Sequence, residues 1–309
     1  MAIKILVGPS SFAEADLTPM NRLIAAGYEV IDNPYKRKLT KQELLVLLDG
    51  SVVGLIAGLE TLDREVLEKA GIRVISRVGA GLSNVDLQAA RDLGIAVFNT
   101  PDAPTDAVAE LTIGAMLSLL RMIPMMNQAL HEGQWQKKIG LQLRGKTVAV
   151  IGFGRIGRRV AALLSPFGAK ILVVDPCVDE RTCAGYRTAT LQVALPEADI
   201  ITVHSSGHDC IIGEKEFHRM KKGVCLLNAA RGGVISEKAL IEALENKTVA
   251  GAWLDTFEEE PYNGTLCKYP NVILTPHVGS YTAECRLRME NEAVNNLLNC
   301  LKVSGENKP

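Results

Sequence analysis

The stretch VAVIGFGRIGRRVAALLSPFGAKILVVDP, residues 148–176, limits the possible folds of this chain more than any other segment. Gly152, Gly154 and Gly157 directly follow the apolar run TVAVI and open a helical pattern, and Asp175 ends the next apolar run. Such a unit binds a dinucleotide, because the glycines allow a tight turn, close approach of the pyrophosphate and close helix–strand packing. A carboxylate at Asp175 accepts from ribose hydroxyls and repels a 2′-phosphate, so we expect NAD rather than NADP.

The position of this motif, in the middle of 309 residues, indicates that another domain precedes it. From residue 3 to residue 99, short β-branched runs alternate with amphipathic segments that end in glycine, which predicts a separate α/β unit. One long helical pattern then runs to about residue 130, and a second βα series begins at residue 146. A last helix follows the second sheet, and we assign it to the first domain. The predicted domains are residues 1–100 with 284–309, and residues 101–283.

Composition excludes several classes of partner. The net charge of −1 and the absence of a long Lys/Arg-rich run argue against nucleic acid and anionic membranes. The most apolar long stretch, residues 107–126, is interrupted by Glu110, Arg121 and Pro124, which favours a buried helix over a membrane span. The seven cysteines include no CxxC pair and are read as reduced thiols, and no metal site is expected. We therefore expect a cytoplasmic protein.

Three polar residues follow apolar strands of the second series, where open α/β sheets bind their ligands: Arg231, Glu260 and His277. Singly, each has an ordinary structural explanation: a surface-loop arginine, one of three consecutive glutamates, and a histidine that caps a turn. Beside a dinucleotide site they form a set suited to oxidation of a 2-hydroxy acid. His277 would take the alcohol proton, Glu260 would stabilise the imidazolium, and Arg231 would hold the substrate carboxylate in a bidentate pair.

Five ordered motifs, VGAGLSNVDL, GFGRIG, NAARGG, DTFEEEP and TPHVGS, resemble those of the D-isomer-specific 2-hydroxyacid dehydrogenases, and most of all their phosphoglycerate dehydrogenase branch in a short form without a regulatory domain. The resemblance covers nearly the whole chain. It implies an α/β fold in which a Rossmann NAD-binding domain is inserted into a flavodoxin-like substrate domain. It also implies a homodimer formed through the helix after residue 105, and a 2-hydroxy or 2-oxo acid as the small-molecule partner.

The resemblance further implies the residues of each site. The catalytic residues are the three already named. Those facing the substrate would be Arg77, Val78, Gly79, Arg231 and His277. The cofactor-binding residues, including the glycine motif, would be Thr105, Gly152, Gly154, Arg155, Ile156, Gly157, Asp175, His204, Ser205, Ala229, Asp255 and Gly279.

The substrate is less constrained than the chemistry. We expect 3-phosphoglycerate or a related anionic D-2-hydroxy acid, but Gly58 stands where phosphoglycerate enzymes commonly carry an arginine that helps to hold the substrate. Residues such as Arg77, Glu60 and Ser83 do not distinguish one acidic tail from another. Two alternatives remain open: an NAD-sensing, corepressor-like scaffold of the same fold, and a phosphite-type dehydrogenase that keeps the same three catalytic residues. The direction of flux, the affinities and the exact oligomeric state are not determined by the sequence.

Overall fold

The computed structural model describes residues 3–179, 181–183, 185–207 and 209–303. They form two compact units: a small unit up to Pro104 and again from Ser280, and a large unit, Thr105–Gly279. The predicted junctions, after residue 100 and before residue 284, differ from these by four residues each. Residues 1–2 and 304–309 of the predicted first domain lie outside the described part of the chain.

The small unit contains a parallel sheet with strand order β2-β1-β3-β4-β5, the flavodoxin-like order. Its strands are β1 (Lys4–Val7), β2 (Glu29–Asp32), β3 (Val52–Ala57), β4 (Val74–Arg77) and β5 (Ala96–Phe98). Its helices are α1 (Thr18–Ala25), α2 (Lys41–Leu47), α3 (Arg64–Ala70), α4 (Leu87–Asp92) and α11 (Ala283–Val303).

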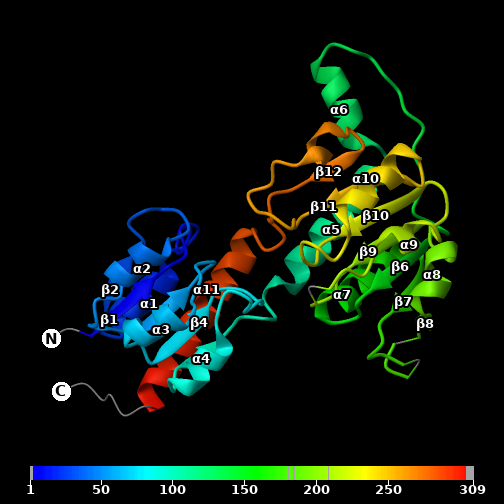
Figure 1. The fold of residues 1–309 in the computed structure, drawn as a ribbon. Coiled ribbons are helices and arrows are strands. Elements are labelled where there is room, and N and C mark those ends of the chain that lie inside the picture. The colour runs from blue at the N-terminus through cyan, green and yellow to red at the C-terminus, as the bar shows by residue number, and fades with distance from the viewer. Residues whose placement is uncertain (1–2, 180, 184, 208, 304–309) are drawn as a thin grey trace. The chain divides into compact units, whose positions relative to one another are not determined.

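The last helix, α11, belongs to the small unit, as the sequence predicted. It packs on β3, β4 and α1 although more than 200 residues separate it from each of them in the chain, and Figure 1 shows it beside β4. The approach is close, because a Cβ built on Gly54 of β3 would lie 3.1 Å from Leu297 Cδ1. The side chain of Glu290 is buried and accepts a hydrogen bond from the backbone N–H of Ala13 at 2.9 Å, which ties α11 to the segment after β1.

The large unit contains a parallel sheet with strand order β12-β11-β10-β9-β6-β7-β8, a doubly wound order with its switch point between β6 and β9. Its strands are β6 (Thr147–Ile151), β7 (Lys170–Val174), β8 (Arg187–Thr188), β9 (Ile200–Val203), β10 (Val224–Asn228), β11 (Val249–Leu254) and β12 (Val272–Leu274). Its helices are α5 (Pro104–Leu120), α6 (Ile123–His131), α7 (Arg155–Leu164), α8 (Leu191–Glu197), α9 (Glu214–Phe217) and α10 (Glu237–Glu245), with 3₁₀ turns at Ser165–Phe167 and Thr265–Lys268.

Successive residues of the strands in this sheet belong to two different hydrophobic clusters. In β6, Val148 and Val150 join the cluster that includes α5 and α7, whereas Ala149 and Ile151 join the cluster that includes α8 and α10. Both faces of the sheet are therefore covered, which explains why its strands are apolar at nearly every position. The predicted Rossmann domain inserted into a flavodoxin-like domain is confirmed.

The single long helix predicted up to residue 130 was wrong. The structure has two helices, α5 and α6, whose axes differ by 66°. Met122 between them takes a left-handed conformation with φ of 48°, and Pro124 stands in the first turn of α6. Because proline cannot donate within a helix and crowds the preceding turn, it fits the start of a new helix better than the middle of one.

No single helix among the described residues is long and apolar enough to span a bilayer, although α5 and α6 taken together meet the criteria of length and composition.

Candidate active site

The glycine loop after β6 is shaped by close backbone contacts. Gly152 has φ of 86°, and a Cβ built on it would lie 2.7 Å from the backbone of His204 and Ser205, at the end of β9. A Cβ built on Gly157 would lie 2.0 Å from the carbonyl oxygen of Gly152. The first turn of α7 can therefore lie this close to the loop after β6 only if residue 157 is a glycine. In contrast, a Cβ on Gly154 would meet nothing within 4 Å, which leaves open space at the N-terminus of α7.

Asp175 lies directly after β7, where its carboxylate is held by two backbone N–H groups. Phe153 donates to Oδ2 at 2.7 Å and Cys177 donates to Oδ1 at 2.8 Å. The first of these bonds joins the glycine loop to the end of β7. The carboxylate is thereby fixed beside the loop, as the dinucleotide fingerprint requires.

Two buried polar atoms at the β6/β9 switch point have no hydrogen-bond partner among the described residues: His204 Nδ1 and Ser205 Oγ. The other ring nitrogen of His204 bonds with Thr202 Oγ1 at 2.8 Å. Burial lowers the pKa of His204 to about 3, so the ring is neutral at physiological pH. Since buried polar atoms are rarely left unpaired, these two fit a polar ligand bound at this point. Together with Asp175 and the open N-terminus of α7, they fit a dinucleotide.

The remaining predicted cofactor residues occupy several places in the large unit. Arg155 and Ile156 lie in the first turn of α7, Thr105 lies in the first turn of α5, and Ala229 follows β10. Asp255, which follows β11, is buried and bonds within the protein. For all five of these residues, contact with a cofactor remains a prediction.

His277 and Glu260, which the sequence predicted to be an acid–base pair, are in contact. His277 Nδ1 lies 2.9 Å from Glu260 Oε2 and 3.2 Å from Oε1, and the backbone N–H of Phe257 donates to Oε1 at 3.1 Å. Because a carboxylate accepts hydrogen bonds, Nδ1 is the donor in this contact, which leaves Nε2 for another partner. The His277 side chain is 44% exposed, so a small ligand can reach it.

Asp255 has a structural role that the sequence analysis did not identify. Its Oδ1 accepts from Thr275 Oγ1 at 2.6 Å and from Val278 N–H at 2.9 Å, and its Oδ2 accepts from Gly279 N–H at 2.8 Å. These three donors surround His277, whose φ of 53° is unusual for a residue with a side chain. Asp255 therefore positions the loop that carries His277. In the sequence, the only signal for this role was the position of Asp255 directly after an apolar strand.

Arg231 lies on the loop after β10, next to the loop that carries Glu260. Asn228 at the end of β10 donates to the carbonyl of Arg231 at 3.0 Å, and the guanidinium donates to the carbonyl of Ala230 at 2.7 Å. A Cβ built on Gly232 would lie 1.9 Å from the carbonyl oxygen of Phe257, so the two loops are in backbone contact. The loops after β10, β11 and β12, three neighbouring strands, thus carry Arg231, Glu260 and His277 at one edge of the sheet.

The predicted substrate contacts Arg77, Val78 and Gly79 lie in the small unit, at and after the end of β4. The N–H of Val78 donates to Ala57 O at 2.9 Å, and the N–H of Gly79 donates to Thr100 Oγ1 at 2.7 Å. Both backbone donors are therefore already used within the small unit, and their contact with substrate remains a prediction. Among the described residues, no group of three or more His, Cys, Asp or Glu side chains is placed to bind a metal ion.

A dinucleotide loop and an Arg–Glu–His set in one doubly wound unit are typical of a nicotinamide-dependent oxidoreductase. Residues 113–279 match the family model described as D-isomer specific 2-hydroxyacid dehydrogenase, NAD binding domain. The chain belongs to this family, and its large unit is the NAD-binding domain.

Individual relatives agree with this assignment. A D-3-phosphoglycerate dehydrogenase of Rattus norvegicus is 36% identical over 300 residues, which cover 94% of this chain and 55% of the relative. A hydroxypyruvate reductase of Thermotoga maritima is 37% identical over 277 residues, which cover 86% of this chain and 90% of the relative. The TT0316 protein of Thermus thermophilus superimposes with a TM-score of 0.89 at 33% identity, over 97% of each chain. The chain spans about half the length of the curated phosphoglycerate dehydrogenases that it matches.

Proposed function

We propose that this protein transfers a hydride between NAD and C2 of a D-2-hydroxy acid or the corresponding 2-oxo acid. The observation that carries the proposal is the contact between His277 Nδ1 and Glu260. This pair lies at the sheet edge that also carries Arg231, and in the same unit as the dinucleotide loop. Family membership supports the reaction class. The relatives named after D-3-phosphoglycerate and after hydroxypyruvate support an acid of this type.

Each of the three side chains has a task in this reaction. Arg231 binds the substrate carboxylate, because a guanidinium stays charged and pairs with it in a bidentate way. In the oxidative direction the hydroxyl proton of C2 passes to Nε2 of His277, and Glu260 stabilises the imidazolium that results. In the reductive direction the same proton returns to the carbonyl oxygen. The chemistry supplied by bound NAD is acceptance of the hydride from C2, or its donation in reverse.

The test is a panel of 2-oxo acids with NADH at several pH values, followed by absorbance at 340 nm. We expect steady oxidation of NADH with at least one of glyoxylate, pyruvate, hydroxypyruvate and 3-phosphohydroxypyruvate. Two further arms cover the alternatives: phosphite with NAD, and a peptide-binding assay with and without NADH. Binding of NADH without turnover of any acid or oxyanion would contradict the proposal.

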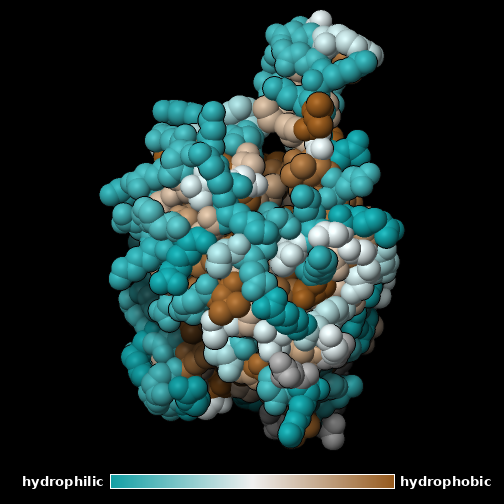
Figure 2. All heavy atoms as spheres, turned by 90° about the vertical axis from the view of Figure 1, so that its right-hand side faces the viewer, coloured by the Kyte–Doolittle hydropathy of each residue, from teal (hydrophilic) through white to brown (hydrophobic). Residues whose placement is uncertain are grey.

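We further propose that the protein forms a homodimer through α5, α6 and the segment that follows them. Apolar side chains on α6 and this segment are exposed, including Ile123, Trp135 and Ile139. A cavity of about 270 Å³ is lined by Met122 and Pro124, the two neighbours of Ile123 in the chain, and by residues such as Leu119 and Ile273. Figure 2 shows brown surface at the base of the protrusion formed by α6 and its following segment. Exposed apolar side chains and an apolar cavity in this part of the large unit support an interface with a second copy of this chain.

We also propose that the protein acts in the cytoplasm. Cys177, Cys210, Cys225, Cys267 and Cys285 are free thiols in the structure, which fits a reducing compartment. Fractionation of the cells that express the protein, with immunodetection in each fraction, tests this proposal.

A further inference from the structure

Two side chains outside the Arg–Glu–His set connect His277 to the core of the large unit. Trp253 of β11 is fully buried, and its indole N–H donates to Thr275 Oγ1 at 3.0 Å. The Thr275 hydroxyl in turn donates to Asp255 Oδ1 at 2.6 Å. All three residues belong to the large unit, as does the loop that carries His277. They form a series of hydrogen bonds from the hydrophobic core to that loop, which we call the Trp253 series.

The direction of each bond in the Trp253 series follows from the groups that form it. An indole nitrogen can only donate, so the oxygen of Thr275 accepts from Trp253. The single hydrogen of the hydroxyl is then left for Asp255, and 2.6 Å is a usual separation for a hydroxyl that donates to a carboxylate. The buried indole therefore helps to fix the direction in which the Thr275 hydroxyl points.

At the other end of the series, the Asp255 carboxylate is bonded to the backbone beside His277. Its Oδ1 also accepts from Val278 N–H at 2.9 Å, and its Oδ2 accepts from Gly279 N–H at 2.8 Å. A Cβ built on Gly279 would lie 3.0 Å from Oδ2, so the backbone passes close to the carboxylate. Thr275 precedes the histidine by two residues, whereas Val278 and Gly279 follow it. The carboxylate is therefore bonded to the chain on both sides of His277.

The backbone of His277 depends on such support. Its φ of 53° lies in the left-handed region, which is unfavourable for a residue with a Cβ. Its N–H donates to the carbonyl of Thr275 at 2.9 Å, which closes the turn on Thr275 itself. In this conformation the ring contacts Glu260 through Nδ1. A change at Thr275 should consequently move the imidazole relative to the Glu260 carboxylate.

We propose that Thr275 and Trp253 are positioning residues for proton transfer by His277. The indole orients the Thr275 hydroxyl, the hydroxyl orients the Asp255 carboxylate, and the carboxylate holds His277 in its left-handed conformation. This proposal rests on the proposed function and deepens it. Both side chains act through Asp255, so neither is a catalytic residue. Because proton transfer requires a short and well-aligned contact, a small displacement of the ring lowers kcat more than it lowers the affinity for NADH.

The first test is the kinetics of Thr275→Val, which keeps the shape of the side chain and removes the hydroxyl. With the 2-oxo acid that the wild-type enzyme reduces best, we expect kcat to fall about tenfold and the Kd of NADH to change much less. Thr275→Ser restores the hydroxyl and should recover most of kcat. A wild-type kcat in Thr275→Val, or no recovery in Thr275→Ser, would overturn the proposal.

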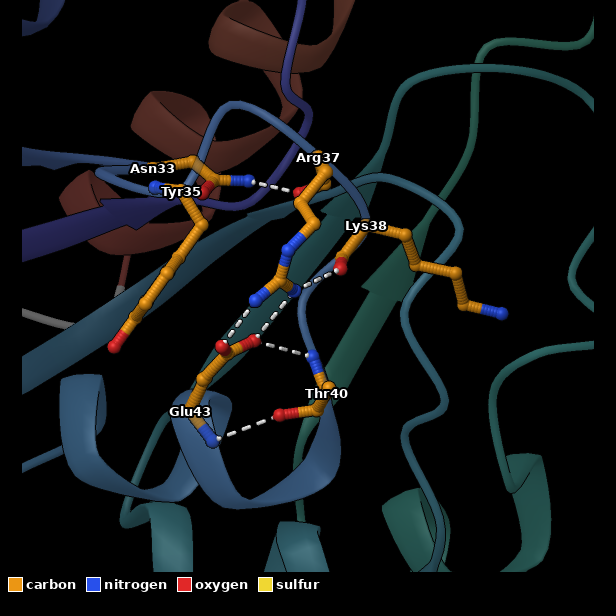
Figure 3. Close-up of polar contacts among 6 residues, drawn as sticks. All are labelled: Asn33, Tyr35, Arg37, Lys38, Thr40 and Glu43. Atoms are coloured by element: carbon orange, nitrogen blue, oxygen red, sulfur yellow. Dashed lines mark hydrogen bonds and ion pairs between the residues drawn. The ribbon is translucent and has the colours of Figure 1, made fainter.

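Thr40→Val is the matched control. Thr40 lies before α2 in the small unit, where its Oγ1 accepts from Glu43 N–H at 3.3 Å. Figure 3 shows this contact, together with the pair of Arg37 and Glu43 beside it. The substitution removes a hydrogen-bonded hydroxyl and a helix cap, so it should lower stability by a change in the small unit alone. We expect a wild-type kcat, and a fall as large as in Thr275→Val would overturn the proposal.

A double variant distinguishes a connected series from two separate supports. Trp253→Phe keeps a buried ring and removes the N–H, and it should lower kcat by less than Thr275→Val. In Trp253→Phe/Thr275→Val we expect kcat to be no lower than in Thr275→Val alone, because the indole acts through a hydroxyl that is already absent. Losses that multiply in the double variant would refute the series. If Thr275→Val does not fold, Trp253→Phe decides, and a wild-type kcat in that variant overturns the proposal.

Failure of the proposed function would look different, because the protein would bind NADH and turn over no acid in any variant. Hydrogen–deuterium exchange then tests the positioning by itself. Exchange at the backbone N–H groups of Val278 and Gly279 should be faster in Thr275→Val than in the wild-type protein, and unchanged in Thr40→Val. Equal exchange in Thr275→Val and the wild-type protein would overturn the proposal, whether or not an acid is reduced.

Discussion

At the scale of single residues, the pair of His277 and Glu260 is the most direct link between structure and chemistry. The 2.9 Å contact joins the Glu260 carboxylate to Nδ1 and leaves Nε2 as the ring nitrogen that can exchange a proton with a substrate. The two residues therefore affect the rate in different ways, and substitutions can separate them.

Substitution of His277 by asparagine should abolish most turnover while NADH binding persists. The proton donor is lost, for which a fall in kcat of about 10²- to 10⁴-fold is typical, whereas the glycine loop is untouched. NADH fluorescence titration and steady-state kinetics measure the two effects. His218→Asn is the matched control, because His218 lies on the surface after α9, where its ring bonds with a carbonyl of that helix. Retained turnover in His277→Asn would refute the assignment of the proton donor.

Substitution of Glu260 by glutamine should lower kcat and leave the affinity for NADH unchanged. The amide keeps an oxygen near His277 Nδ1 but lacks the negative charge that stabilises the imidazolium formed when a 2-hydroxy acid is oxidised. Steady-state kinetics and NADH fluorescence titration measure the two effects. A variant with the kcat of the wild-type enzyme would contradict the role given to Glu260.

His204 gives a prediction about stability. Burial lowers its pKa to about 3 from an ordinary 6.5, so the unfolded chain takes up a proton below about pH 6.5 that the folded chain does not. Stability is therefore unaffected by this group above pH 6.5 and falls as the pH drops toward 3. The loss between pH 7.5 and pH 5.5 should be about 1.4 kcal/mol. Urea unfolding at both pH values measures this loss of unfolding free energy, which should be smaller in His204→Gln than in the wild-type protein. An equal loss in the two proteins would contradict the prediction.

At the scale of residues, the sequence predicted which side chains follow which strands, and from this that Glu260 lies close to His277. It did not predict the hydrogen bonds that hold the loop carrying His277 in place. The bonds from Thr275, Val278 and Gly279 to Asp255 join positions about 20 residues apart whose side-chain directions depend on loop geometry. Likewise, Gly58 was recognised as unusual, but no sequence pattern showed that the Glu60 carboxylate fills the space beside it.

At the scale of elements, the turn between β6 and α7 shows why the glycine motif has its spacing. Gly157 and Gly154 lie three residues apart on one turn, yet the first meets backbone and the second meets open space. The two should therefore respond to the same substitution in opposite ways.

Gly157→Ala should destabilise the large unit and lower Tm by several degrees, because its Cβ would sit 2.0 Å from a backbone oxygen. Gly154→Ala should leave Tm unchanged, since φ of −73° suits alanine, and should weaken NADH binding by crowding the open N-terminus of α7. Thermal unfolding and NADH titration of both variants test the pair. The reverse pattern would mean that the two glycines have been assigned the wrong roles.

The elements themselves were largely predictable, because the strands of both sheets are apolar runs and several helices, such as α1, α3 and α4, are followed by glycine. The break between α5 and α6 was the exception. Hydrophobic periodicity continues through the break, and the left-handed conformation of Met122 is a local backbone choice that periodicity does not report. Pro124 was the available signal, and it marks the beginning of α6.

At the scale of the whole molecule, the proposed dimer can be tested by its exposed side chains. Ile139 is 97% exposed and Trp135 is 79% exposed, and large apolar residues exposed in a group are typical of an interface. The double variant Trp135→Ser/Ile139→Ser should shift the protein from dimer toward monomer in light scattering after size exclusion. Val46→Ser on α2, which removes an apolar side chain of 72% exposure, should not. A wild-type protein that is monomeric at micromolar concentration would refute the proposal.

The return of α11 to the small unit also bears on the order in which the molecule is made. The ribosome releases the strands of the small sheet before the large unit, but it releases the helix that covers β3 and β4 only after the large unit. The large unit is continuous in the chain, so it can complete its core while that helix is still being synthesised. The small unit can consequently complete its core only after the whole large unit has been synthesised.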